Sequence, residues 1–280
     1  MKSEKHRMIN TVAAAIALLV LIAHSESAEP FKLDKRDVIA FTGGTNTVRA
    51  DKAGYLEALL TRRFAGASLR FRNLSWEGDT VFRQSTVSDR WREEAFGGWS
   101  EQLRRVEATV MFAQFGQIEA LRGKDGLKEF VAAYERLIDV FMKCTQRVVL
   151  ISPTPFEKPA PLQPDLSKRN ADLELYVGAI GKIAQRRGLD FVDVFTRFEK
   201  SQNEVTLTSN GMHVIPEAQR IVALAITRAL GDTVTEFGTS FESLRAAVVT
   251  KNTLWFEYWR PANWKCLFGD DSNRVFGRAG

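Results

Sequence analysis

The chain has 280 residues, of which 45% are hydrophobic and 26% charged, and its formal net charge is +5 at pH 7. This composition suits one substantial globular domain with a large core and excludes a disordered or low-complexity chain. The excess of positive charge is too small to indicate a nucleic-acid-binding protein.

The N-terminal segment has the pattern of a secretory signal peptide. Lys2, Lys5 and Arg7 precede an apolar run from Thr11 to Ala23, and small residues follow. This run is shorter than the roughly 20 residues that a membrane-spanning helix needs. We therefore expect residues 1–27 to be a signal peptide. The mature protein would then be exported, to the periplasm or out of the cell, without a stable membrane span.

Beyond residue 30, short apolar runs alternate with longer amphipathic segments. The expected strands are Val38–Phe41, Leu69–Leu74, Thr109–Gln114, Arg147–Ser152 and Asp190–Val194. The expected helices are Ala53–Phe64, Trp99–Val106, Gly126–Met142, Asn170–Arg187 and Pro216–Leu230. This alternation with continuously apolar strands predicts a parallel sheet with helices on both faces.

Three candidate site segments each follow an expected strand: Gly43–Asn46, Ser75–Thr80 and Phe115–Glu119. Ligands of parallel sheets bind at the carboxyl ends of the strands, so we expect these segments to share one cleft. The glycine turn would expose the hydroxyl of Thr45 above the sheet. Further along, Asn210-Gly-Met-His213 supplies the only histidine outside the first two dozen residues. A turn hydroxyl with a late histidine indicates acyl-transfer chemistry.

These segments resemble the sequence blocks of the SGNH, or GDSL-type, hydrolases over roughly residues 36–230. Phe41-Thr-Gly-Gly-Thr45 looks like the first block, whose serine is the nucleophile. Asn73–Thr80 resembles the second, in which a glycine, here Gly78, lends a backbone N–H to the oxyanion hole. Phe115–Glu119 is similar to the third block and Asn210–His213 to the last. The resemblance implies a three-layer α/β/α sandwich with a central parallel sheet in the flavodoxin-like order.

The same blocks depart from the family pattern at the positions that carry the chemistry. Thr45 replaces the nucleophilic serine, and Gly44 replaces the aspartate before it. Ile118 replaces the asparagine that donates to the oxyanion, a loss that typically costs about 10²–10³ in rate. Asn210 replaces the aspartate that orients the histidine, a change of about 10⁴ in a well-studied triad.

Other residues could compensate for these departures. The amides of Gln114 or Gln117 could replace the missing oxyanion donor, and the carboxylates of Asp79 or Glu119 could orient His213. Each residue also suits an ordinary structural role, such as a loop amide or an acid at a helix start. Asn46 could present its amide to the cleft or, as is more common for asparagine, cap the following helix.

Residues 233–280 are expected to be a C-terminal extension of an SGNH hydrolase-like domain at residues 30–232. A short helix at Phe241–Val249 precedes Leu254–Trp264, where aromatic residues are dense. This favours a tail that docks on the domain over a surface that stacks sugar rings or binds a partner protein. Trp259–Gly269 resembles an extension found in SGNH-like proteins of planctomycetes and related bacteria.

Cys144 and Cys266 lie too far apart in sequence to form a metal-ligand motif. Export would permit a disulfide, but Cys144 also suits a buried thiol at a helix end, and the sequence leaves both open. No metal or cofactor is indicated, because one histidine and scattered acids form no ligand cluster.

Two functions follow from the resemblance. The first is an exported ester hydrolase with acylated carbohydrate as a candidate substrate, in which Thr45 attacks, His213 takes its proton and Gly78 helps to hold the oxyanion. The second is a catalytically inactive module that uses the cleft to bind a glycan or a partner protein. The expected ligand in either case is a small ester or glycan, not a nucleic acid or a phosphate. The glycine turn lacks the lysine and spacing of a P-loop. Activity, substrate and oligomeric state stay open.

Overall fold

The computed structural model of the chain describes residues 31–82, 93, 95–202, 206–231, 237–261 and 263–267. The expected signal peptide lies outside these residues, as does the end of the C-terminal extension. Residues 32–280 form one compact unit.

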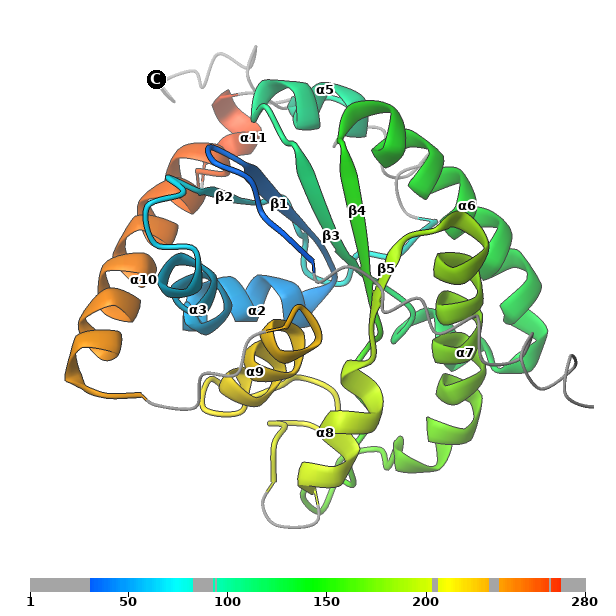
Figure 1. Ribbon diagram of the computed structural model, residues 1–280. Coiled ribbons are helices and arrows are strands. Elements are labelled where there is room, and N and C mark those ends of the chain that lie inside the picture. Colours follow the sequence, from blue (N-terminus) through cyan, green and yellow to red (C-terminus); the bar gives the residue numbers. More distant parts are fainter. Residues whose placement is uncertain are drawn as a thin grey trace, which may run out of the picture. The chain divides into compact units, whose positions relative to one another are not determined.

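A single parallel sheet occupies the centre of this unit (Figure 1). Its strands are β1 (Val38–Gly43), β2 (Arg70–Asn73), β3 (Val110–Gln114), β4 (Arg147–Ile151) and β5 (Asp190–Val192), in the order β2-β1-β3-β4-β5. Every pairing is parallel. All of β1 is buried, as expected of a strand that helices cover on both faces. The predicted fold class is therefore confirmed.

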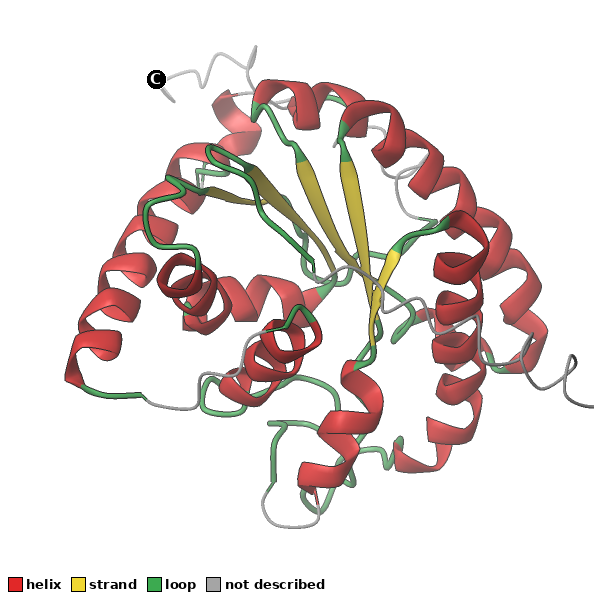
Figure 2. Cartoon of the chain, in the orientation of Figure 1, coloured by secondary structure: helices red, strands yellow, loops and turns green. Residues whose placement is uncertain are grey.

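Helices flank the strands on both sides of the sheet (Figure 2). Their bounds are α2 (Thr45–Ala53), α3 (Tyr55–Arg63), α5 (Trp99–Arg105), α6 (Leu127–Cys144), α7 (Asn170–Arg187), α8 (Val194–Gln202), α9 (Gln219–Ala229), α10 (Thr239–Trp259) and α11 (Trp264–Leu267). Short 3₁₀ turns lie at Glu119–Arg122, Lys124–Gly126 and Ser167–Arg169. Helices α5, α6 and α7 pack in sequence on one face, whereas α3 lies against α9 and α10 on the other. No described helix is long and apolar enough to cross a membrane.

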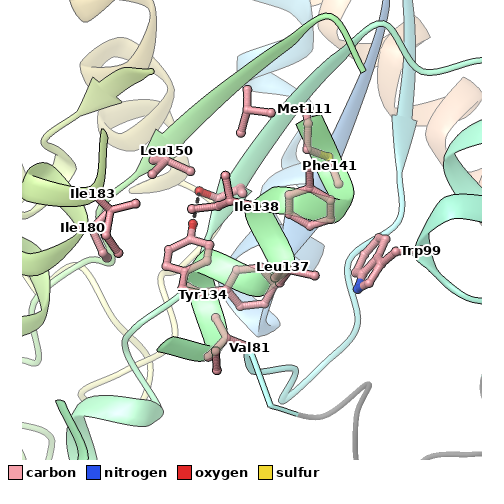
Figure 3. Packing of buried hydrophobic residues seen from close by; sticks show 14 of the residues in the cluster. Val81, Trp99, Met111, Tyr134, Leu137, Ile138, Phe141, Leu150, Ile180 and Ile183 are labelled. Carbon is pink, nitrogen blue, oxygen red and sulfur yellow. Dashed lines mark hydrogen bonds between the residues drawn. The ribbon is translucent and has the colours of Figure 1, made fainter. Parts of the chain in front are cut away.

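Aromatic and branched side chains fill the space between the sheet and helix α6 (Figure 3). Tyr134 and Phe141 of α6 are fully buried there, beside Met111 of β3. The ring of Trp99 meets that of Phe141 edge-on, with 5.4 Å between centroids. The hydroxyl of Tyr134 donates to the carbonyl oxygen of Ala113 at 3.3 Å. This packing fixes helix α6 against the strands whose carboxyl ends carry the candidate site.

The structure differs from the expected helices at three places. The expected helix Ala53–Phe64 is α3, but a further helix, α2, precedes it from Thr45, and Gly54 at φ 73° separates the two. Helix α8 was not expected, because its sequence follows β5 with almost no loop. Helix α9 begins at Gln219, after a turn that contains Pro216.

The C-terminal extension contains a 21-residue helix, α10, longer than the expected Phe241–Val249. It ends at Trp259, before Pro261, which cannot continue a helix. Trp259 is buried in the core cluster, and Trp255 stacks on it with 5.1 Å between ring centroids. These tryptophans thus pack on the domain, as the docking interpretation predicts. Cys144 and Cys266 are both free thiols.

Candidate active site

One pocket at the carboxyl ends of β1, β3 and β4 brings the sequence blocks together. Its lining residues are Gly44, Thr45, Asn46, Thr47, Asp79, Gln114, Phe115, Gly116, Gln117, Ile118, Glu119, Pro153, Thr154, Met212 and His213. Gly78 and Asn210 lie directly behind it, because Gly78 contacts Thr45 and Asn210 contacts His213. The prediction of a single cleft therefore agrees with the geometry, whereas the catalytic roles of these residues stay predictions.

The glycine turn places Thr45 at the first residue of helix α2, directly after β1. A Cβ at Gly43 would lie 2.3 Å from Oγ1 of Thr47 and 2.5 Å from the carbonyl oxygen of Gln114, so only glycine fits there. The backbone N–H of Gly78 donates to Oγ1 of Thr45 at 3.0 Å. Within the described chain, no hydrogen bond joins Thr45 to His213. The hydroxyl is therefore paired with the second block and not with the histidine.

The side chain of Asn210 faces the ring of His213. Its Nδ2 lies 3.2 Å from Nδ1 of the histidine. The orientation of this amide is fixed by its own loop, because Oδ1 accepts the backbone N–H groups of Met212, at 3.2 Å, and of His213, at 2.9 Å. The group that points at the ring is therefore the amide NH₂, a hydrogen-bond donor.

A second donor approaches the same ring nitrogen. Nη2 of Arg49, on helix α2, lies 3.4 Å from Nδ1 of His213. A guanidinium has no acceptor, so Nδ1 can pair with it only through its lone pair. Burial lowers the pKa of His213, and the charge of Arg49 lowers it further, while the more distant Glu77 acts in the opposite direction. Burial and Arg49 together thus favour the neutral form of the histidine.

These contacts select one tautomer of His213. With donors from Asn210 and Arg49 at Nδ1, the neutral ring carries its proton on Nε2. In a working triad the carboxylate accepts a hydrogen bond from Nδ1–H, and the free Nε2 is the base. The arrangement is reversed here, so the ring offers a donor at Nε2.

The carboxylates considered for compensation have other partners. Oε1 of Glu119 accepts the backbone N–H of Val81, and Oε2 accepts that of Gly116, both at 2.9 Å. Oδ1 of Asp79 accepts the N–H of Thr80 at 3.1 Å. Among the described residues neither acid hydrogen-bonds the ring of His213. Glu119 instead joins the second and third blocks.

Burial raises the pKa of Glu119 to about 7, and the nearby charge of Asp79 adds to the rise. The backbone N–H groups that it accepts act the other way. A carboxyl with this pKa sits beside the cleft without touching the histidine.

The side-chain amides of Gln114 and Gln117 also hydrogen-bond the backbone of a neighbouring loop. Nε2 of Gln117 donates to the carbonyl oxygen of Thr154 at 3.0 Å. Nε2 of Gln114 donates to the carbonyl oxygen of Ser152 at 3.0 Å. Neither amide replaces the oxyanion donor that Ile118 lacks, and the side chain of Ile118 lines the pocket as an apolar wall.

Asn46 hydrogen-bonds several of the loops around the cleft and is not a helix cap. It lies inside helix α2, whose N-cap residue is Gly44. Its Nδ2 donates to the carbonyl oxygen of Met212 at 3.0 Å and to Oε1 of Gln117 at 3.2 Å. Its Oδ1 accepts the N–H of Val214 at 3.0 Å. One side chain thus ties the first, third and last blocks together.

The model of the GDSL-like lipase/acylhydrolase family matches residues 30–221. The chain belongs to this family. Its α/β sandwich and the cleft at the strand ends are the family's fold, and helix α10 lies beyond the matched region. A comparison with curated proteins finds no match.

Several solved structures share the fold at low sequence identity. A catalytic mutant of Axe2, an acetylxylan esterase from Geobacillus stearothermophilus, is 17% identical with a TM-score of 0.58, covering 74% of this chain and 100% of its own. An α/β hydrolase from the metagenome of Lake Arreo is 17% identical with a TM-score of 0.57, covering 72% and 99%. A gut microbial diltiazem-metabolizing enzyme is 17% identical with a TM-score of 0.60, covering 72% of this chain and 48% of its own.

The functional residue that sequence reasoning missed is Arg49. It lies four residues after Thr45, so the two side chains share one face of helix α2. The signal was present in the spacing. It was hidden because the polar segment after the glycine turn has no apolar periodicity and was not expected to be helical.

Proposed function

We propose that this chain is a non-hydrolytic member of the GDSL-like family, exported from the cell, whose cleft binds an acylated carbohydrate. The observation that carries the proposal is the pair of donors, from Asn210 and Arg49, at Nδ1 of His213. A histidine with its proton on Nε2 cannot accept the proton of Thr45, so the first step of ester hydrolysis has no base.

The surroundings of His213 also oppose the protonated ring that hydrolysis would create. An imidazolium gains most from a carboxylate, and here it would face the guanidinium of Arg49 instead. Among the pocket residues that the structure describes, none supplies the donor that Ile118 lacks. The hydrolytic site is in this sense degenerate at each of its steps: base, charge stabilisation and oxyanion.

The same groups suit the binding of an oxygen-rich ligand. The N–H at Nε2 of His213 and the hydroxyl of Thr45, whose oxygen accepts the N–H of Gly78, are donors that match acetyl carbonyl and sugar hydroxyl oxygens. The apolar side chains of Ile118 and Met212 can contact an acyl methyl group. The acetylxylan esterase among the similar folds supports an acetylated sugar as the first ligand class to test.

A second candidate function, a threonine-dependent ester hydrolase, is favoured by one contact. The N–H of Gly78 lies 3.0 Å from Oγ1 of Thr45, so this donor is beside the attacking oxygen and within reach of the oxyanion that forms on the attacked carbonyl. In that case Thr45 would attack the ester carbonyl while His213 takes its proton, and the ester bond would break as the alcohol leaves with that proton. Water would then release the acyl group from Thr45 as the free acid. The reaction requires His213 to change its tautomer.

Two assays on the full chain separate these functions. Hydrolysis of p-nitrophenyl acetate and release of acetate from acetylated xylo-oligosaccharides are measured beside Thr45→Ala and His213→Ala. Thr253→Ala, at an exposed position of α10, controls for handling. Calorimetry measures binding of the same oligosaccharides.

We expect equal background hydrolysis from all four proteins and oligosaccharide binding that His213→Ala weakens. Turnover that both Thr45→Ala and His213→Ala abolish would overturn the proposal and establish the hydrolase. Absence of both turnover and binding would reject the ligand class.

A further inference from the structure

The last turn of helix α10 reaches the loop that carries Gly78. Arg260 follows the helix and is only 6% exposed. Its guanidinium lies over the ring of Trp76, 3.8 Å from the centroid. Its Nη1 donates to the carbonyl oxygen of Ser75. Arg260 belongs to the extension, outside the family-matched residues 30–221.

The loop from Ser75 to Asp79 is short, and it is hydrogen-bonded to strand β1 at Trp76 and closed by a turn from Trp76 to Asp79. The N–H of Trp76 donates to the carbonyl oxygen of Gly43 at 3.2 Å, and the N–H of Asp79 donates to the carbonyl oxygen of Trp76 at 3.2 Å. Gly78 adopts φ 68° in this turn. Its N–H is thereby directed at Oγ1 of Thr45. A shift of Trp76 would consequently move the Gly78 donor.

Arginine is suited to this position for a chemical reason. Its planar guanidinium can stack on an indole and donate in the ring plane to a carbonyl at the same time, which a lysine ammonium cannot reproduce. Two neighbouring residues, Ser75 and Trp76, are held by one side chain. Ser75 is also fixed from within the sheet, because its N–H donates to Oδ1 of Asn73 at 2.8 Å.

Helix α10 also supports helix α2, which carries Thr45, the residue that Gly78 contacts. Nζ of Lys251 lies 2.8 Å from Oε2 of Glu57, on α3. The amide of Asn252 donates to the carbonyl oxygen of Asp51, on α2, at 3.0 Å. Helix α2 begins with Thr45. The extension therefore contacts both the helix that carries the hydroxyl and the loop that carries the donor.

We infer that Arg260 is a positioning residue of the cleft: it holds the Ser75–Asp79 loop so that the N–H of Gly78 meets the hydroxyl of Thr45. The C-terminal extension is then a part of the site's architecture. This role holds whether the cleft hydrolyses esters or only binds them, so its test does not depend on a ligand.

The test is amide hydrogen exchange, measured by NMR on the full chain, with Gly78 compared with the amides of strand β3. The variants are Arg260→Ala and Arg260→Lys. The matched control is Arg245→Ala, an arginine of the same helix that lies 4.7 Å from the ring centroid of Tyr55 and donates to the carbonyl oxygen of Ala53 at 3.1 Å. These contacts of Arg245 are with residues remote from the Gly78 loop.

We expect Arg260→Ala to speed exchange at Gly78 by about tenfold relative to β3, and Arg260→Lys to do so by less. Arg245→Ala should leave that ratio unchanged. An unchanged ratio in Arg260→Ala, or an equal increase in Arg245→Ala, would overturn the inference. If Arg260→Ala fails to fold, Arg260→Lys decides: no increase at Gly78 relative to Arg245→Ala would overturn it.

Discussion

Asn210 presents its amide nitrogen, 3.2 Å away, to the Nδ1 edge of His213, where the carboxylate of a Ser-His-Asp triad would accept a hydrogen bond. A flip of this amide would be costly, because its oxygen already accepts two backbone N–H groups of its own loop. Arg49 adds a second donor at the same nitrogen. The amide nitrogen of Asn210, in place of an aspartate oxygen, thus puts a donor at Nδ1 and the ring proton of His213 on Nε2.

Replacing Arg49 should raise the pKa of His213. Arg49→Met removes a positive charge that opposes the imidazolium, and methionine keeps part of the packing. The pKa is followed by NMR titration of the ring protons, with His213→Gln used to assign the signal among the histidines. Arg63→Met removes an arginine of helix α3 that instead donates to the carbonyl oxygen of Leu230, so it should leave the pKa unchanged. Equal shifts in both variants would contradict a specific effect of Arg49.

The double change Thr45→Ser and Asn210→Asp should create hydrolytic activity. One oxygen of the new carboxylate keeps the loop contacts, and the other takes the place of Nδ2 and accepts a hydrogen bond from Nδ1–H of His213. We expect a gain on the order of 10²-fold in p-nitrophenyl acetate hydrolysis, part of the factor that such a carboxylate supplies in a triad. The same double variant with His213→Ala is the control. A gain that survives the loss of His213 would be unrelated to the tautomer.

The stability of the protein should depend on pH through Glu119. The folded pKa of about 7 lies above the ordinary value of 4.5, so between these values the folded state keeps a proton that the unfolded state has released. This contribution, on the order of 3 kcal/mol, is fully present below pH 4.5 and is lost as the pH rises through 7.

Glu119→Gln should remove that part of the pH dependence. The variant should be about 1–3 kcal/mol less stable at low pH, because its amide NH₂ faces a backbone N–H, and the difference should shrink as the pH rises. Urea unfolding at pH 5 and pH 8 measures both effects. Glu101→Gln, at an exposed acid paired with Arg105, should show no such narrowing. A difference that stays constant with pH would refute this assignment.

The turn at Gly43 should not tolerate a side chain. Gly43→Ala would put a Cβ 2.3 Å from Oγ1 of Thr47, and we expect a loss of about 2–4 kcal/mol in the free energy of unfolding. At Gly178, an exposed position of helix α7, a Cβ meets nothing within 4 Å. Gly178→Ala should therefore stabilise the protein by about 0.5–1 kcal/mol. Similar losses in both variants would mean that the turn is not as tight as the contact implies.

The positions of the strands along the chain and the single cleft could be predicted from the sequence because they rest on local signals, whereas the order of the strands in the sheet followed from the family resemblance. Val38–Gly43 is a continuous apolar strand, and Asn170–Arg187 was predicted with its observed bounds. Helix α2 could not be predicted, because its residues have no apolar stripe and are helical through tertiary packing. Because helix α2 was not predicted, the position of Arg49 and the hydrogen bonds of Asn46 could not be predicted either.

The orientation of side chains was the second limit. The replacement of an aspartate by Asn210 is visible in the sequence, but the direction of its amide depends on two backbone contacts that only the folded loop provides. Similarly, Glu119 could be placed near the cleft from its block, but its engagement by Val81 and Gly116 could not. The sequence blocks thus locate Asn210 and Glu119, but the hydrogen bonds of the folded chain decide what their side chains can bind.

The position of the proton on the ring of His213 decides between binding and hydrolysis, and ¹⁵N NMR of the histidine side chains measures it directly. At pH 8 the neutral ring of His213 should show a protonated Nε2 and an unprotonated Nδ1, matching the donors of Asn210 and Arg49. A ring protonated on Nδ1, with a free lone pair on Nε2, would contradict the account and return His213 to the role of a catalytic base.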